Sequence, residues 1–396
     1  MPTETSISSQ VDDEEALAPD AIDDEDTTRG DATVKPWDPS KIRITTKHFS
    51  LRDVVDQIVD EEIDLSPDFQ RDYVWKQRQR TRLVESILLG IPLPAFYFNQ
   101  NSEGTYQVVD GVQRLSTISL FMKDGHTLDR VDLEYLRDLH GLKYSQLDPS
   151  ALRRFRSTQI VVHVIEPQTP DEVKYDIFGR VNTLGSPLSA QEIRHAMSKA
   201  RSRKFLKELT ELTSFDNATA WQYWRRDAEE GKVRESGRMT NRELALRFCA
   251  FRRYSDEEYR QHSSLDAFLV EYTHRLDAIE GKAVLSDEAL EELRADFDRA
   301  MENAYQVLGK AAFRRWPSFQ KRRGPINRAV FESQAIALAD YSLDRLLPRK
   351  DAIVAAFRAA FDDQEYSRAV TVGTGDPKAV ERRLSRTRAI LAEVLA

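Results

Sequence analysis

Two patterns of apolar positions divide the chain near its middle. In the first half, apolar residues three and four positions apart predict a helix over residues 49–58. Alternating and β-branched residues predict strands over residues 95–99, 106–109 and 159–165, the first two joined as a hairpin. Few strands mixed with helices make residues 36–200 an α+β domain.

Helical spacing dominates the second half. Residues 201–396 contain hardly any strand pattern and are expected to form a helical domain, with helices over 330–343 and 352–361 among others. One long helix is predicted from the phase shared by Leu290, Leu293, Phe297, Met301, Tyr305 and Leu308.

Two helix starts carry capping signals. Thr169 is followed by Pro170 and, three positions on, by Glu172, which predicts a threonine cap with proline in the first turn. Ser189 and Glu192 have the spacing of a second capping box.

The net charge of −8 comes from one end of the chain. Residues 1–35 hold 11 acidic and 2 basic side chains, so the rest carries 55 acidic and 56 basic groups. Low hydrophobicity and high charge predict a disordered tail over 1–35. Two interpretations stay open: a solubilising tail, or one that mimics nucleic acid and shields a basic groove.

Cysteine content and hydropathy exclude several classes. A single cysteine, Cys249, rules out a disulfide framework or a cysteine-rich zinc site. The apolar runs fall well short of the roughly 20 residues of a membrane span, and the N-terminus has no secretory signal, so a cytoplasmic protein is expected. The seven histidines are scattered, so a zinc-stapled nuclease is not expected in this chain.

The densest polar chemistry lies at residues 110–114, where an apolar strand runs into Asp110 and Gly111 and an amphipathic helix follows. The free N–H groups of a helix start and its dipole favour an anion. Arg114 adds a fork of donors suited to phosphate, and Gly111 permits close approach of a backbone. An ordinary turn with an incidental arginine is the alternative.

Two further polar segments accompany this turn. In 67–75, Gln70 and Arg71 stand between aromatic residues that can anchor a loop, and this places them well for a ligand. In 177–189, Arg180 and Asn182 lie where one helix ends and the next begins. Asn182 as a helix-ending residue and Arg180 as a surface charge are the plainer interpretations.

Together these segments resemble the N-terminal family of the GmrSD type IV restriction system, whose signature is a DGQQR turn. The matching stretches are 69–75, 109–115 and 178–194, three ordered blocks within roughly residues 45–200. Residues 326–332 and 372–375 resemble the helical extension common in stand-alone members.

The resemblance implies a ParB/sulfiredoxin-like domain with a small mixed sheet that binds and hydrolyses a nucleotide. It implies that Gly111 and Arg114 hold phosphates, that Gln113 orients water or phosphate, and that Asp110 contacts Mg²⁺ or the nucleotide. The implied pocket is completed by Gln70, Arg71, Arg180 and Asn182.

The implied function is a Mg²⁺-dependent NTPase or nucleotide sensor in a prokaryotic restriction and anti-phage defence system, which gates a nuclease in another chain. Val112 replaces the first glutamine of the signature. If that glutamine places water, hydrolysis is impaired here; if its side chain faces the strand layer, valine is harmless.

A basic stretch with aromatic residues, 313–323, is a candidate nucleic-acid contact. It motivates the alternative function, a non-enzymatic DNA-binding or adaptor protein that keeps the fold without hydrolysis. The plainer interpretation is a solvated loop whose aromatic residues pack inward. The candidate contacts are Arg314, Arg315, Lys321, Arg322 and Arg323.

Overall fold

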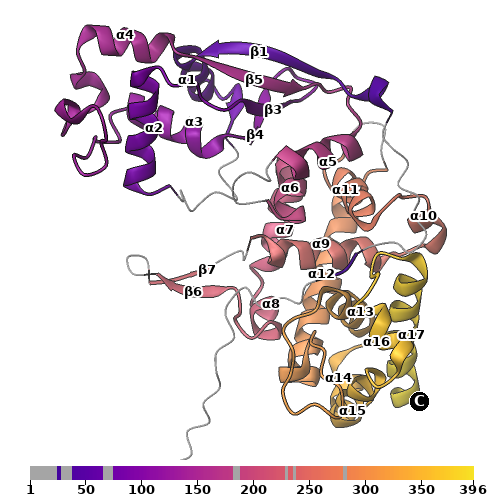
Figure 1. Cartoon of the computed structure of the whole chain (residues 1–396). Coiled ribbons are helices and arrows are strands. Elements are labelled where there is room, and N and C mark those ends of the chain that lie inside the picture. Colours follow the sequence, from indigo (N-terminus) through magenta and orange to yellow (C-terminus); the bar gives the residue numbers. More distant parts are fainter. Residues whose placement is uncertain are drawn as a thin grey trace, which may run out of the picture.

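Figure 1 shows a sheet domain above a helical domain in the computed structural model of the chain. The structure describes residues 25–27, 38–65, 75–181, 188–227, 231–234, 238–279 and 283–396. Gln70, Arg71 and Asn182 lie outside the described residues, so their predicted roles stay predictions.

A five-stranded mixed sheet forms the centre of the first domain, in the order β1-β5-β3-β4-β2. Strands β3 and β4 are the predicted antiparallel hairpin, with Phe98 opposite Val108. β5 lies antiparallel to β1 and parallel to β3, and the short β2 lies parallel to β4. The strands are β1 (Ile44–Ser50), β2 (Ile63–Asp64), β3 (Phe96–Gln100), β4 (Tyr106–Asp110) and β5 (Gln159–Ile165).

Four helices cover one face of this sheet: α1 (Leu51–Val59), α2 (Gln77–Leu89), α3 (Val112–Met122) and α4 (Pro149–Ser157). Because side chains alternate along a strand, Phe96 and Phe98 point into this layer together with Val108 and Val162. These apolar residues and the inward faces of the helices form the larger core of the domain.

The opposite face is covered by α5 (Asp171–Val181) and α6 (Ala190–Met197). Phe178 and Ile193 pack there against Val109 and Ile165. The predicted capping box of α6 is confirmed, because the Glu192 amide donates to Ser189 Oγ and the Ser189 amide donates to Glu192 Oε2.

The predicted threonine cap is wrong, because the Thr169 side chain bonds the main chain of Arg43. The Thr169 hydroxyl donates to the Arg43 carbonyl at 3.0 Å and accepts from the Arg43 amide at 3.1 Å. The side chain therefore ties the chain before β1 to the start of α5 instead of capping the helix.

The second domain is helical, as predicted, around one large core. Its helices are α7 (Ala200–Thr210), α8 (Thr213–Ala218), α9 (Thr240–Arg252), α10 (Asp256–Arg260), α11 (Leu265–Leu276), α12 (Asp287–Asn303), α13 (Arg328–Ala339), α14 (Leu343–Leu346), α15 (Lys350–Ala360), α16 (Gln364–Ala369) and α17 (Pro377–Leu395). An α+β domain followed by helices confirms the predicted fold class.

Two features of the helical domain differ from the prediction. The expected long helix ends at Asn303, and a π-helical turn over Ala304–Leu308 follows. That turn shifts the phase, so Tyr305 is exposed whereas Leu308 is buried. A hairpin of β6 (Trp224–Asp227) and β7 (Gly231–Arg234) was not predicted.

The acidic tail is also not uniform. Within the segment predicted to be disordered, Glu25 carries a nearly buried side chain that is paired with Arg247 of α9. Apart from residues 25–27, the tail over 1–35 lies outside the described residues.

Candidate functional site

The turn between β4 and α3 depends on glycine. Gly111 has φ of 100° and occupies the N-cap position of α3, a backbone conformation that disfavours residues with a Cβ. A Cβ at this position would lie 2.2 Å from Cδ1 of the fully buried Phe96 ring. Since no side chain caps this helix start, its first N–H groups remain directed at the turn.

Arg114 folds back from α3 onto the start of β3. It donates to the carbonyl oxygens of Pro94 at 2.5 Å and Ala95 at 3.3 Å, and to Asp110 Oδ2 at 2.7 Å. Its guanidinium carbon lies 4.1 Å from the centroid of the Phe96 ring. Burial lowers the pKa of Arg114, an effect that the Asp110 carboxylate opposes.

Arg114 therefore has a structural role, because these contacts join α3 to β4 and to the start of β3. The Arg114 side chain is 13 % exposed, which leaves a small surface for a phosphate. Replacement of Arg114 by alanine would disturb the turn itself, so it is a poor test of ligand binding.

Val112 points away from the turn. Its side chain is buried in the core between α3 and the sheet. This position favours the alternative in which residue 112 faces the strand layer, so that valine in place of the signature glutamine is harmless. Gln113, the next residue, is half-buried, and its carbonyl accepts from the Thr117 hydroxyl at 2.7 Å.

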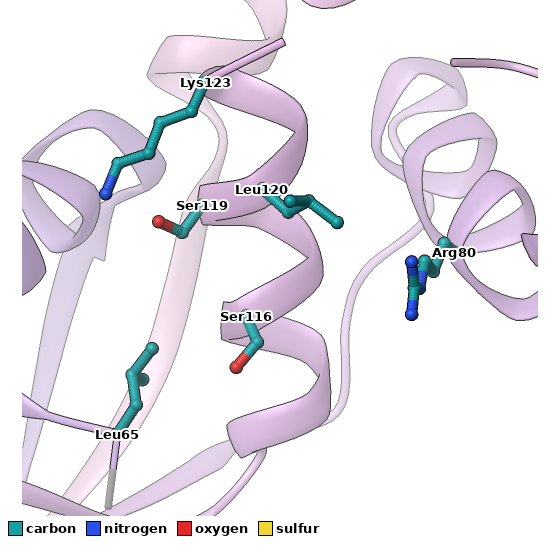
Figure 2. A pocket seen from close by; sticks show the side chains of 6 residues that line it. All are labelled: Leu65, Arg80, Ser116, Ser119, Leu120 and Lys123. Carbon is teal, nitrogen blue, oxygen red and sulfur yellow. The ribbon is translucent and has the colours of Figure 1, made fainter. Parts of the chain in front are cut away.

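A cavity of about 450 Å³ lies beside α3 (Figure 2). In this view, the polar ends of Ser116, Ser119 and Lys123 lie on one side of α3, whereas Leu120 and Arg80, which α2 contributes, lie on the other side. Two cations and two hydroxyl groups, with no carboxylate among the lining residues described, favour an anionic ligand. The described lining residues are Leu65, Arg80, Ser116, Ser119, Leu120 and Lys123.

The cavity and the turn lie along the same helix, with Gly111 at the N-cap of α3 and Lys123 at its C-cap. Gln113, Ser116, Leu120 and Lys123 are spaced three or four residues apart, so they share one side of α3. Leu65 follows β2, whose carboxyl end points the same way as that of its parallel neighbour β4. Leu65 itself lines the cavity, and residues 66–74 lie outside the described residues.

Arg180 approaches from the other layer. It lies on the last turn of α5, 78 % exposed, and its Nε lies 2.9 Å from Asp176 Oδ2. Helix α5 packs on the sheet face opposite to α3 through Phe178. The described contacts thus place Arg180 on a different layer from Arg114.

The basic stretch separates into buried and exposed residues. Arg314 is buried and donates to the Gly324 carbonyl and to Gln222, both at 3.2 Å. Burial, assisted by the charge of Arg323, lowers its pKa to about 10. Arg314 therefore serves the fold, whereas Lys321 and Arg322 are exposed beside Phe319, which is 74 % exposed.

The other two candidate cations of this stretch, Arg315 and Arg323, are half-buried. Arg323 donates to the Lys310 carbonyl at 3.2 Å. Arg358 braces the same loop, with its guanidinium carbon 4.3 Å from the centroid of the Trp316 ring.

Sequence reasoning missed Arg80, Ser116, Ser119 and Lys123. The polar stripe along α3 was the available signal, but Arg80 joins it only through packing of α2 against α3. Across the described ranges, no group of three or more His, Cys, Asp or Glu residues is arranged to hold a metal ion. Within the same ranges, no helix combines the length and apolarity needed to cross a bilayer.

Comparison with protein families matches residues 51–198 to the model described as the GmrSD restriction endonuclease, N-terminal domain. No curated protein matches the chain. A solved Pnob8-like ParB-N domain is similar with 11 % identity over 90 % of this chain and 99 % of that one. Its TM-score is 0.20, too low to support a conclusion about this fold.

Proposed function

We propose that the chain is a nucleotide-binding module of a prokaryotic restriction and anti-phage defence system, because residues 51–198 match the model of the GmrSD restriction endonuclease, N-terminal domain. In this proposal it hydrolyses NTP with Mg²⁺ and gates a nuclease supplied by another chain. The observation that carries the proposal is the cationic cavity beside α3, whose volume of about 450 Å³ suits a small ligand.

Each part of the region has a task in this proposal. Lys123 and Arg80 neutralise phosphate charge, and the hydroxyl groups of Ser116 and Ser119 donate to phosphate oxygens. The first N–H groups of α3, which no side chain caps, are a second candidate anion contact at the Gly111 end of the helix. Gln70, Arg71, Arg180 and Asn182 stay in the proposal on the family resemblance alone.

The turn offers Mg²⁺ one carboxylate, that of Asp110. Mg²⁺ in nucleotide sites is commonly held by one or two carboxylates and by the phosphates themselves. Asp110 is the carboxylate of the turn, and one of its oxygens already accepts from Arg114. Asp110 would therefore contact an ion that arrives with the nucleotide, where the ion would neutralise phosphate charge. Gln113, on the first turn of α3, is the proposed residue that orients water.

The variants Lys123→Ala and Arg80→Ala test the proposal. Each is expected to weaken nucleotide binding by about tenfold or more, because a hydrogen bond to a charged group contributes about 1.5–3 kcal/mol. Isothermal titration calorimetry with ATP and GTP in Mg²⁺ measures the affinity, and phosphate release with and without EDTA measures hydrolysis. Lys378→Ala, at an exposed lysine of α17, is the control.

The proposal fails if the wild-type protein binds neither nucleotide. It also fails if both cavity variants bind as tightly as the Lys378 control. Binding without phosphate release would support the proposed nucleotide site and contradict the proposed hydrolysis.

The exposed side chains Phe319, Lys321 and Arg322 favour a second candidate, DNA binding without hydrolysis. Combined alanine substitution of Lys321 and Arg322 is then expected to weaken DNA binding and to reduce its salt dependence by about two phosphate contacts. Fluorescence anisotropy with labelled duplex and single-stranded DNA at several salt concentrations measures both effects. Equal binding by the wild-type protein and the double variant contradicts this candidate.

A further inference from the structure

A short acidic segment from the beginning of the chain is inserted into the helical domain. Glu25 accepts two hydrogen bonds from Arg247 of α9, at 2.9 and 2.6 Å, in a bidentate arrangement. The Thr374 hydroxyl donates to the same carboxylate at 2.6 Å. The Glu25 side chain is only 5 % exposed, although Asp26 and Thr27 are exposed residues.

The backbone of the segment is held as well. The Thr374 amide donates to the Asp26 carbonyl at 2.8 Å. At Gly375, a Cβ would lie 2.3 Å from the Thr27 carbonyl oxygen, so glycine leaves room for the segment to pass. The contacts thus recognise a carboxylate and main-chain carbonyl oxygens rather than a large apolar side chain.

The receiving loop, residues 372–375, is braced by bonds that do not involve the segment. Arg383 of α17 donates to the Thr374 carbonyl at 2.7 Å. Tyr259 donates to the Gly375 carbonyl, also at 2.7 Å. Because these bonds come from the helical core, the loop has its shape independently of Glu25.

Charge also favours an acidic occupant. Among the described residues, four linked arginines, Arg194, Arg247, Arg328 and Arg383, face three carboxylates of the helical half, Glu243, Asp266 and Glu332. Glu25 supplies the fourth carboxylate. Without it, the largely buried network would hold one arginine in excess, which is costly in a low dielectric.

We propose that Arg247 and the 372–375 loop form a recognition site for an acidic peptide segment, and that the occupant is Glu25–Thr27 of the same chain. Docking ties the segment before the sheet domain to the helical domain, which adds a second link between them. This proposal does not depend on nucleotide binding. It gives part of the acidic tail a specific partner inside the molecule.

A peptide of residues 19–31 tests the site in trans. Glu25→Ala in the full chain empties the site, so fluorescein-labelled peptide should bind this variant. It should bind the wild-type chain at least about tenfold more weakly, because a tethered segment competes at an effective concentration near millimolar. Peptide carrying Glu25→Gln should lose binding. Peptide carrying Asp26→Ala should keep most of it, since the Asp26 carbonyl accepts from the Thr374 amide at 2.8 Å and its side chain has only a longer bond, 3.4 Å, from the Gly373 amide.

Equal anisotropy titrations of the wild-type chain and the Glu25→Ala chain, or no binding to either, would overturn the proposal. A second measurement keeps Glu25 in place. Cys249 is buried, so Asp26→Cys offers a single accessible thiol for a fluorophore. Excess unlabelled peptide should release the labelled segment and lower its anisotropy, and an unchanged anisotropy contradicts an exchangeable site.

Discussion

Replacement of Arg247 by methionine is expected to lower the free energy of unfolding by about 3–5 kcal/mol, because it leaves buried carboxylates without their partner. Arg247 bonds Glu25 and Glu243 and lies 3.5 Å from Glu332, with 3 % of its side chain exposed. Burial raises the pKa of Glu243, but Arg247, Arg328 and Arg194 outweigh it and lower that pKa to about 2. Glu243 is therefore charged at pH 7, where urea unfolding measures the loss.

Arg253→Met is the matched control for this prediction. Arg253 follows α9 and pairs with Glu292, but its side chain is 52 % exposed. Exposed ion pairs contribute about 0–1 kcal/mol, so this variant should unfold nearly as the wild type does. Equal urea midpoints for the Arg247 and Arg253 variants would show that the buried network does not stabilise the fold as described.

Replacement of Gly111 by alanine is expected to destabilise the protein by about 2–5 kcal/mol. Positive φ costs a residue with a Cβ about 1–2 kcal/mol. The added methyl group also meets the buried Phe96 ring, and overpacking adds about 1–3 kcal/mol. The displaced turn should weaken nucleotide binding as well, which calorimetry can measure at a temperature where the variant is folded.

Gly90→Ala separates the two causes. Gly90 ends α2 with φ of 78°, and a Cβ there would meet no atom within 4 Å. Only the backbone cost of about 1–2 kcal/mol remains. If thermal denaturation gave the same loss for both variants, the close approach of Gly111 to Phe96 would have no energetic importance.

The parts of the fold with strong local patterns were predictable. Residues 159–165 are rich in β-branched side chains and form β5 with the predicted bounds, and Ser189 with Glu192 caps α6 as expected. Strand β1 escaped notice because it is largely exposed at the sheet edge and lacks an apolar alternation. Its place is set by pairing with β5, more than 100 residues away.

The candidate site was predictable only in part. The Asp110–Arg114 turn has a local signature, and the structure confirms a glycine turn at a helix start. Arg80 lies over 30 residues from the α3 stripe, and only the packing of α2 on α3 joins them. Composition alone does not distinguish Glu25 from the other acidic residues of the tail. Its pairing with Arg247 appears only in the folded structure.

The position of a bound nucleotide tests the central claim most directly. A crystal structure of the wild-type protein with a non-hydrolysable NTP and Mg²⁺ should place phosphates in the cavity beside α3, in contact with Arg80 or Lys123. Phosphates bound elsewhere, with the cavity beside α3 empty of ligand, would contradict the proposed nucleotide site.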